Sequence, residues 1–222
     1  MSCSIRLYKD SDYEVVREIF TCGIKEHSGT AFHHALSLPH IWVLQLLTFL
    51  VLLQTTGSLT VAVVAVIATV ALLWLLCRYI YSSYVQQSLQ DDMLDIRKYY
   101  LQRDGYCFWV AESAGEVVGT VAAVPPHHPG GDRQVELKRL SVPRRHRGKG
   151  IAKALCQTVI DFAKQRDCEA VILETSLSQY DACRLYEKMG FRESRNSCPP
   201  HPVTKLIDFR ILFYQYDILK HR

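Results

Sequence analysis

The amino-acid sequence predicts an α/β (α+β) fold in which helices flank a sheet and an apolar helical hairpin interrupts the domain. Three observations lead to this fold class. Segments with strand spacing and segments with helix spacing alternate before residue 36 and again after residue 80. A basic, glycine-containing turn joins an apolar strand to the start of a helix. Residues 36–80 contain two long uncharged runs, so we expect one domain, built from residues 1–35 and 81–222, with a membrane hairpin inserted between them.

Composition excludes some classes of function. The chain has 222 residues and a formal net charge of +4, which is small for a nucleic-acid binder that relies on many phosphate contacts. Its eight cysteines lack metal-ligand spacing, so we expect reduced thiols in a reducing compartment and no metal site. Polar and charged residues precede the first apolar run, so no signal peptide is expected.

The first elements read as a strand at residues 5–8 followed by an amphipathic helix over 12–26. Ser11 and Glu14 have the spacing of a capping box at the start of that helix. This opening is typical of a folded domain.

Two apolar runs follow, at residues 38–53 and 59–77, and a polar turn at 54–58 separates them. As helices the runs would be about 24 and 28 Å long, close to the roughly 30 Å thickness of the hydrocarbon core of a bilayer. Aromatic residues gather near the ends away from the turn, as in an interfacial belt: Trp42, Trp74, Tyr79 and Tyr81. The alternative, a hairpin buried in a soluble core, would need more surrounding chain than this sequence offers.

The later elements follow from apolar spacing and turn residues. A helix is expected over 83–102, with Asp91, Asp92 and Asp95 facing away from its apolar side. The further elements expected are strands at 107–112, 117–124 and 135–142, a helix at 151–166, a strand at 170–174, a helix at 179–189, a strand beginning at 191 and a strand at 209–216. His127 and His128 fall in a Pro/Gly loop without the spacing of a metal pair, so we interpret them as solvated.

The basic turn after the strand at 135–142 predicts an anion site. Gly148 and Gly150 allow the backbone to approach a ligand closely, and the following helix offers free N–H groups and the positive end of its dipole. Four basic side chains accompany them: Arg144, Arg145, Arg147 and Lys149. The pattern suits the pyrophosphate of one small ligand.

Two motifs now support a family resemblance. Residues 145–150 fit R-x-x-G-x-G, and residues 147–152 fit the overlapping R-x-x-G-x-A. Residues 182–191 fit A-x-x-L-Y-x-x-x-G-F. In this order, and with these strands and helices around them, they resemble the GNAT acetyltransferase superfamily. The resemblance implies the GNAT acyltransferase fold, a mixed, mostly antiparallel and splayed sheet flanked by helices, and acetyl-CoA as co-substrate.

The same resemblance implies where acetyl-CoA would bind. The turn and helix start would hold the pyrophosphate: Arg145, Arg147, Gly148, Lys149, Gly150, Ile151 and Ala152. The strand residues Leu140, Ser141 and Val142 would pair with the amide groups of the pantetheine arm. Gln179 stands where the superfamily often has Asn, so an amide is retained but the side chain differs.

For the catalytic residues the resemblance leaves alternatives open. Tyr186 matches the tyrosine that serves the departing sulfur, and its alternative role is core packing beside Leu185. The base that takes the proton of the amine has three candidates: Glu136 on the strand before the turn, Glu174 at the end of the next strand, or a chain of water molecules.

Residues 107–113, 140–142 and 150–155, together with the hairpin, are similar to the camello-like, cysteine-S-conjugate N-acetyltransferase family. This implies an endoplasmic reticulum or Golgi membrane protein that acetylates the α-amino group of a small amino-acid conjugate. A lysine N-acetyltransferase of secretory-pathway membranes and an inactive CoA-binding scaffold are the alternatives. The acceptor pocket is expected from 27–35, 125–133 and 198–205, whereas the acceptor itself and the oligomeric state are not predicted.

The hairpin also restricts topology. The two parts of one domain must share a side of the bilayer, so the hairpin crosses an even number of times or dips in and returns. Positive charge lies on the domain side, which favours the cytosol: Lys25, Arg78, Arg97 and Lys98.

Overall fold

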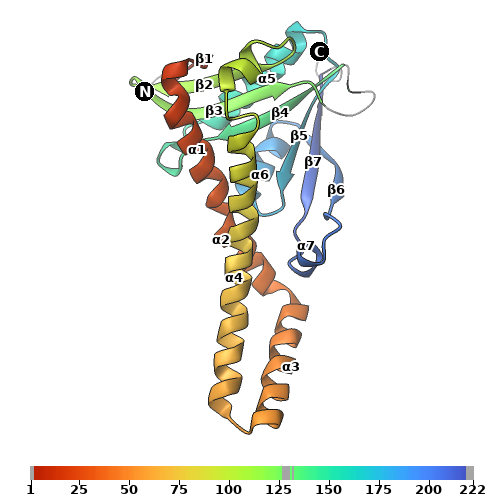
Figure 1. Ribbon diagram of the computed structural model, residues 1–222. Coiled ribbons are helices and arrows are strands. Elements are labelled where there is room, and N and C mark those ends of the chain that lie inside the picture. The colour runs from red at the N-terminus through yellow and green to blue at the C-terminus, as the bar shows by residue number, and fades with distance from the viewer. Residues whose placement is uncertain (1–2, 127–130, 132, 219–222) are drawn as a thin grey trace.

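The computed structural model describes residues 3–126, 131 and 133–218 (Figure 1). Within these residues one sheet of seven strands has the order β1-β2-β3-β4-β5-β7-β6. The strands are β1 Ser4–Leu7, β2 Cys107–Ser113, β3 Glu116–Val124, β4 Gln134–Ser141, β5 Ala170–Ser176, β6 Arg192–Ser197 and β7 Ile211–Asp217. Only the β4–β5 pair is parallel among these neighbours. The predicted mixed, mostly antiparallel sheet is therefore confirmed.

Helices flank the sheet, and a stalk projects from it. The α-helices are α1 Tyr13–Lys25, α2 His27–Ser37, α3 Pro39–Thr56, α4 Leu59–Gln90, α5 Ile151–Gln165, α6 Tyr180–Lys188 and α7 Pro202–Leu206. A short π-helix, η2, covers Arg97–Leu101. Figure 1 shows α3 and the adjoining half of α4 extending away from the sheet, while the other half of α4 runs up beside it.

The sheet separates two apolar clusters. One face packs against α5, where Leu155 meets residues such as Leu137 and Leu173. The other face packs against α1, where Phe20 belongs to a second cluster. Val124 of β3 is part of this second cluster and is the register partner of Glu136 on β4. The Glu136 side chain therefore points to the α1 and α4 face of the sheet.

Strands β4 and β5 separate at the centre of the sheet. Their parallel pairing ends at Leu137 and Leu173. Residues 138–141 and 174–176 continue the two strands without pairing to each other. The expected splay is therefore present, and it leaves free backbone N–H and C=O groups along the end of β4.

A β-bulge in β4 accompanies the splay. The register with β3 shifts between Thr120 and Ala122, and Arg139 has a positive φ of 56°. The buried Thr120 hydroxyl donates to the Arg139 carbonyl at 2.8 Å. A bulge bends its strand and increases the local twist, which turns the end of β4 away from β5.

The segments before and after the hairpin share one sheet. Strand β1 pairs with β2, from Ser4 opposite Glu112 to Leu7 opposite Trp109. Both ends of the hairpin therefore return to the same folded domain.

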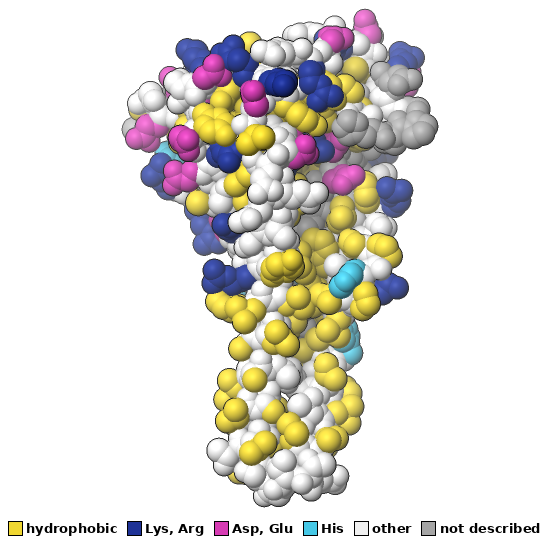
Figure 2. Space-filling model, in the orientation of Figure 1, with side chains coloured by type: hydrophobic (Ala, Val, Ile, Leu, Met, Phe, Trp, Pro, Cys, Tyr) yellow, Lys and Arg dark blue, Asp and Glu magenta, His cyan; other side chains and the backbone are white. Residues whose placement is uncertain are grey.

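The hairpin itself is apolar and exposed. Helices α3 and α4 are both long and apolar enough to cross a membrane, with mean hydropathy of 1.3 and 2.7 over their most apolar windows. Only 11% of each window is buried, and Figure 2 shows hydrophobic side chains over the stalk while charged side chains gather on the domain. A hairpin buried in a soluble core is therefore excluded. The Thr69 hydroxyl on α4 donates to the Gln45 Oε1 atom on α3 at 2.7 Å, and this hydrogen bond joins the two helices of the hairpin.

Helix α4 corrects the expected break near residue 83. It continues as one helix of 32 residues to Gln90, because no proline or glycine interrupts it after the apolar run. The predicted helix over 83–102 is therefore wrong as a separate element. Its first part is the end of α4, and its last part is η2.

Three smaller expectations also change. Helix α2 was not predicted, because its sequence has a glycine and small buried residues, Ala31 and Ala35, in place of a strong apolar stripe. Helix α7 was not predicted because it is only five residues long. The Ser11 capping box does not form. The Lys9 N–H donates instead to the Asp12 carboxylate at 2.9 Å, one turn before α1 begins.

Candidate active site

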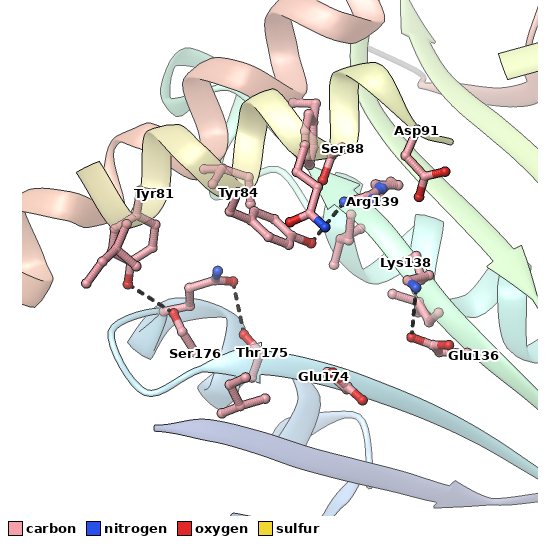
Figure 3. Close-up of a pocket in the computed structure, with 18 of the residues that line it drawn as sticks. Tyr81, Tyr84, Ser88, Asp91, Glu136, Lys138, Arg139, Glu174, Thr175 and Ser176 are labelled. Carbon is pink, nitrogen blue, oxygen red and sulfur yellow. Dashed lines mark hydrogen bonds and ion pairs between the residues drawn. The ribbon is translucent and has the colours of Figure 1, made fainter. Parts of the chain in front are cut away.

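A cavity of about 460 Å³ lies where β4 and β5 separate (Figure 3). The ends of the two strands form one wall, and α1 and α4 form another. The α4 residues on this wall are Ile80, Tyr81, Tyr84, Gln87 and Ser88. The Tyr81 hydroxyl lies 3.3 Å from the Ser176 hydroxyl at the end of β5. The same helix that carries the apolar stalk therefore also shapes the cavity.

Both candidate bases reach this cavity. Glu136 is the register partner of Ile172, two residues before Glu174, so the two carboxylates lie on one face of neighbouring strands. Figure 3 shows them there, with Lys138 next to Glu136. Glu136 is 9% exposed, and its Oε1 atom lies 3.4 Å from the Lys138 Nζ atom.

Glu174 differs from Glu136 in exposure. Its side chain is exposed at the cavity. Partial burial of its carboxyl, followed by the charge of Glu136, raises the pKa of Glu174, while Lys138 acts in the opposite direction. Glu174 thus holds a proton to higher pH than an ordinary glutamate, and the pair resists carrying two negative charges at once.

Tyr186 packs in the core and also reaches the cavity. Its ring packs against Phe191 and Tyr214, with centroid distances of 5.7 and 5.9 Å, and the residue is 5% exposed. It also lines the cavity, and its hydroxyl donates no hydrogen bond to any residue that the structure describes. Burial raises the pKa of Tyr186 well above its usual value, so the hydroxyl stays protonated and is available to a ligand.

The basic turn forms an open cradle. Gly148 and Gly150 have φ values of 75° and 79°, which glycine adopts without the strain that side chains bring. A Cβ atom at either glycine would meet nothing within 4 Å, so the space above the turn is free. Helix α5 begins at Ile151 with no side-chain cap, and its first N–H groups face the same side. These features fit a pyrophosphate.

The arginines of the turn divide into two kinds. The Arg147 Nε atom donates to the Val142 carbonyl at 2.8 Å, and its Nη2 atom pairs with Glu26, the residue that follows the end of α1. The Arg144 Nε atom also binds Glu26, at 2.9 Å. These two side chains tie the turn to α1. Arg145 contacts only the neighbouring His146 ring among the described residues.

The remaining predicted contacts lie along the same path. Leu140 lines the cavity, while the Ser141 hydroxyl donates to the Ile19 carbonyl at 3.0 Å. Gln179 lines the cavity and accepts a hydrogen bond from the Thr175 hydroxyl at 3.0 Å. Lys149 is exposed beside the glycines, whereas Ile151 is buried and Ala152 partly buried. These last two can offer only their backbone N–H groups. The structure thus places the predicted residues on one path from the turn to the splay.

The expected acceptor pocket is placed differently. Residues 27–35 belong to α2, which packs on the base of the hairpin, and 198–205 does not reach the cavity. Phe209 and Ile211 line it instead, just beyond that segment. His127 and His128 lie outside the described residues. In the part of the chain that the structure describes, no group of three or more His, Cys, Asp or Glu side chains could hold a metal ion.

A buried ionic network beside the cavity was not predicted. The Arg139 Nη2 and Nε atoms bind the two oxygens of Asp92 at 2.6 and 2.8 Å, and both side chains are less than 10% exposed. The Tyr100 hydroxyl also donates to Asp92, and Arg139 Nη1 donates to the Tyr84 hydroxyl at 2.9 Å. Asp92, expected to face away from the apolar side of its helix, is therefore buried in this network. The signal in the sequence was that Asp92 stands next to Met93, within a helical pattern of apolar residues.

The splayed mixed sheet, the uncapped helix behind a glycine turn, and a cavity lined by two carboxylates and a buried tyrosine define an acyltransferase site of the GNAT type. Residues 71–191 match the acetyltransferase (GNAT) family. The chain is 47% identical over 191 residues to N-acetyltransferase 8F1 of Mus musculus, covering 86% of each chain. It is 42% identical to N-acetyltransferase 8 of Rattus norvegicus, covering 98% of each, and 40% identical to the camello protein of Xenopus tropicalis, covering 97% of each.

The chain therefore belongs to the GNAT acetyltransferase family, in its N-acetyltransferase 8 and camello-like group, and it is an N-acetyltransferase. Solved structures agree on the fold. A ribosomal-protein-alanine N-acetyltransferase from Brucella melitensis matches with a TM-score of 0.57 at 19% identity, covering 96% of this chain and 99% of that one. A Salmonella typhimurium protein solved with its cofactor acetyl-CoA matches with a TM-score of 0.55 at 17% identity, covering 98% and 95%.

Proposed function

We propose that this protein is a membrane-anchored enzyme that transfers acetyl from acetyl-CoA to the α-amino group of a small amino-acid conjugate, such as a cysteine S-conjugate. One observation carries the proposal. The cavity that holds Glu136, Glu174 and Tyr186 is walled by the continuation of the apolar helix α4. Tyr81 lies one helical turn beyond Cys77, where the uncharged run ends. An acceptor with an apolar group would thus meet the site close to the bilayer surface.

The residues fit acetyl-CoA as the donor. The turn at Gly148 and Gly150 and the first N–H groups of α5 suit its pyrophosphate. The unpaired end of β4, at residues 138–141, offers backbone groups to the amides of the pantetheine arm. The thioester supplies an activated acetyl group in the splay. This path leads from the turn to the cavity without crossing the apolar core.

Side chains in the cavity then take part in two proton transfers. As the amine forms a bond with the acetyl carbon and the carbon–sulfur bond breaks, the amine must lose a proton, which Glu136 accepts. The departing thiolate needs a proton, which the Tyr186 hydroxyl supplies. Its raised pKa, caused by burial, keeps the hydroxyl protonated before the reaction, so that it can donate to the developing thiolate. Glu174 is the alternative base on the neighbouring strand.

The hairpin supports a position at an endoplasmic reticulum or Golgi membrane with the domain on the cytosolic side. The pairing of β1 with β2 requires both ends of the hairpin to be on one side. Positive charge near those ends, at Lys25 and Arg78, favours the cytosol. Acetyl-CoA supply and the eight free cysteines agree with that side.

A thiol-release assay tests the proposed function. The full chain, purified in detergent or nanodiscs, is incubated with acetyl-CoA and one amine from a panel of cysteine S-conjugates, free amino acids and lysine peptides. We expect free thiol with the S-conjugates. Release with lysine peptides alone would select a lysine N-acetyltransferase, and no release with any amine would indicate a CoA-binding scaffold.

Replacing Tyr186 by phenylalanine is expected to lower kcat by about 100-fold, because proton transfer to the leaving group is lost. The KM for either substrate should change little, since the hydroxyl acts in the transition state. Stability should also hold, because the ring contacts with Phe191 and Tyr214 remain. Steady-state kinetics with a melting curve check this. A Y186F variant with unchanged kcat would assign Tyr186 to packing alone.

A further inference from the structure

Two cations line the cavity among the described residues, Lys138 and Arg139. Three N–H groups of Arg139 donate to Asp92 and the Tyr84 hydroxyl. Its side chain is 7% exposed and its charge is paired with the Asp92 carboxylate. Lys138 is therefore the cation that an acceptor could recruit.

Lys138 is placed to act beside the proposed base. It follows Glu136 by two residues on β4, so both side chains project from one face of the strand. Its Nζ atom lies 3.4 Å from the Glu136 Oε1 atom, and its side chain is 34% exposed. An ammonium group has three donors, so the single carboxylate contact leaves two of them open to the cavity.

We propose that Lys138 binds the carboxylate of the acceptor and makes the enzyme specific for amines that carry one on the same carbon. In an α-amino acid a single carbon separates the amine from the carboxylate. Glu136 and Lys138 are in direct contact, so they can receive these two groups at once. The charges then alternate, with the amine at Glu136 and the carboxylate at Lys138.

The neighbouring groups are compatible with this arrangement. Glu174 and Asp91 also line the cavity and would repel a second carboxylate. Lys138 offsets this repulsion, because its positive charge acts on both Glu136 and Glu174. Without Lys138, three acidic groups would line the cavity: Glu136, Glu174 and Asp91. The other cation, Arg139, is already paired with Asp92. The carboxylate therefore depends on Lys138.

The inference rests on the proposed function, and the test compares two acceptors that differ in the carboxylate alone. S-Benzyl-L-cysteine and the decarboxylated amine S-benzylcysteamine are assayed with the full chain, with Lys138→Met and with Lys138→Arg. The wild type is expected to prefer the acid by at least tenfold in kcat/KM. Lys138→Met should lose at least tenfold more kcat/KM with the acid than with the amine, because any effect on the neighbouring Glu136 is common to both acceptors. Lys138→Arg should restore most of the preference.

Lys98→Met serves as the matched control, because this lysine is exposed on η2, away from the cavity. Equal losses with both acceptors in Lys138→Met would overturn the inference and assign Lys138 to the donor or the base. So would a variant that keeps the preference for the acid. If the wild type acetylates neither acceptor, the proposed function fails and the inference fails with it. If the wild type does acetylate the acid, the proposed function holds, and a failure of the other comparisons then concerns Lys138 alone.

Discussion

Replacing Glu136 by glutamine is expected to lower kcat by about 100- to 1,000-fold, because general base catalysis contributes factors of this size. Glutamine keeps the shape and the hydrogen-bonding ability of the side chain but cannot take the proton. Glu136 is nearly buried in the splay, beside Lys138. The KM for acetyl-CoA should remain within a few fold, since the cradle at Gly148 and Gly150 is untouched.

Two further variants make this result specific. Glu174→Gln is expected to lower kcat much less, because Glu174 is exposed at the cavity, whereas Glu136 is nearly buried beside Lys138. Glu116→Gln, at the exposed start of β3, should have no effect. A larger loss in E174Q than in E136Q would transfer the base to Glu174. Losses of only a few fold in both would indicate a chain of water molecules.

The turn and its helix could be predicted because their chemistry is local. Two glycines with positive φ and an uncapped helix start follow from adjacent residues. The pattern of residues 135–142 also predicted that Glu136 lies on a strand. The face that Glu136 occupies required its register with β3, and its approach to Glu174 required the parallel register of β4 with β5. That register joins residues far apart in sequence and is not written in any local pattern.

The residues that form the walls of the cavity were harder to predict from the sequence. Periodicity located the apolar run of α4, but the continuation of this helix to Gln90 brings Tyr81 and Tyr84 to the site. Helix α2 was missed because its buried positions are small, although Ala31 and Ala35 allow close packing on the hairpin base. Two of the segments expected at the acceptor pocket, 27–35 and 198–205, therefore do not line this cavity. Contacts between distant elements decide which side chains face the acceptor.

The ionic network of Asp92 and Arg139 leads to the second large effect. Asp92→Asn is expected to destabilise the protein by about 3–5 kcal/mol, because it leaves the Arg139 charge buried without its partner. For a chain of this size the loss corresponds to a fall in Tm of roughly 6–20 °C. Thermal unfolding in detergent measures it, and Asp161→Asn on the exposed face of α5 should melt like the wild type.

The double variant Asp92→Asn with Arg139→Gln separates the pair energy from general disruption. Removing both charges avoids the unpaired group, so the double variant should be less destabilised than the sum of the two single variants. Arg139 also carries the bulge of β4 and touches α4 through Tyr84. Its loss should therefore weaken CoA binding at temperatures where the fold persists, because the free end of β4 is no longer held in place. Strict additivity of the three melting shifts would show that Asp92 and Arg139 act independently.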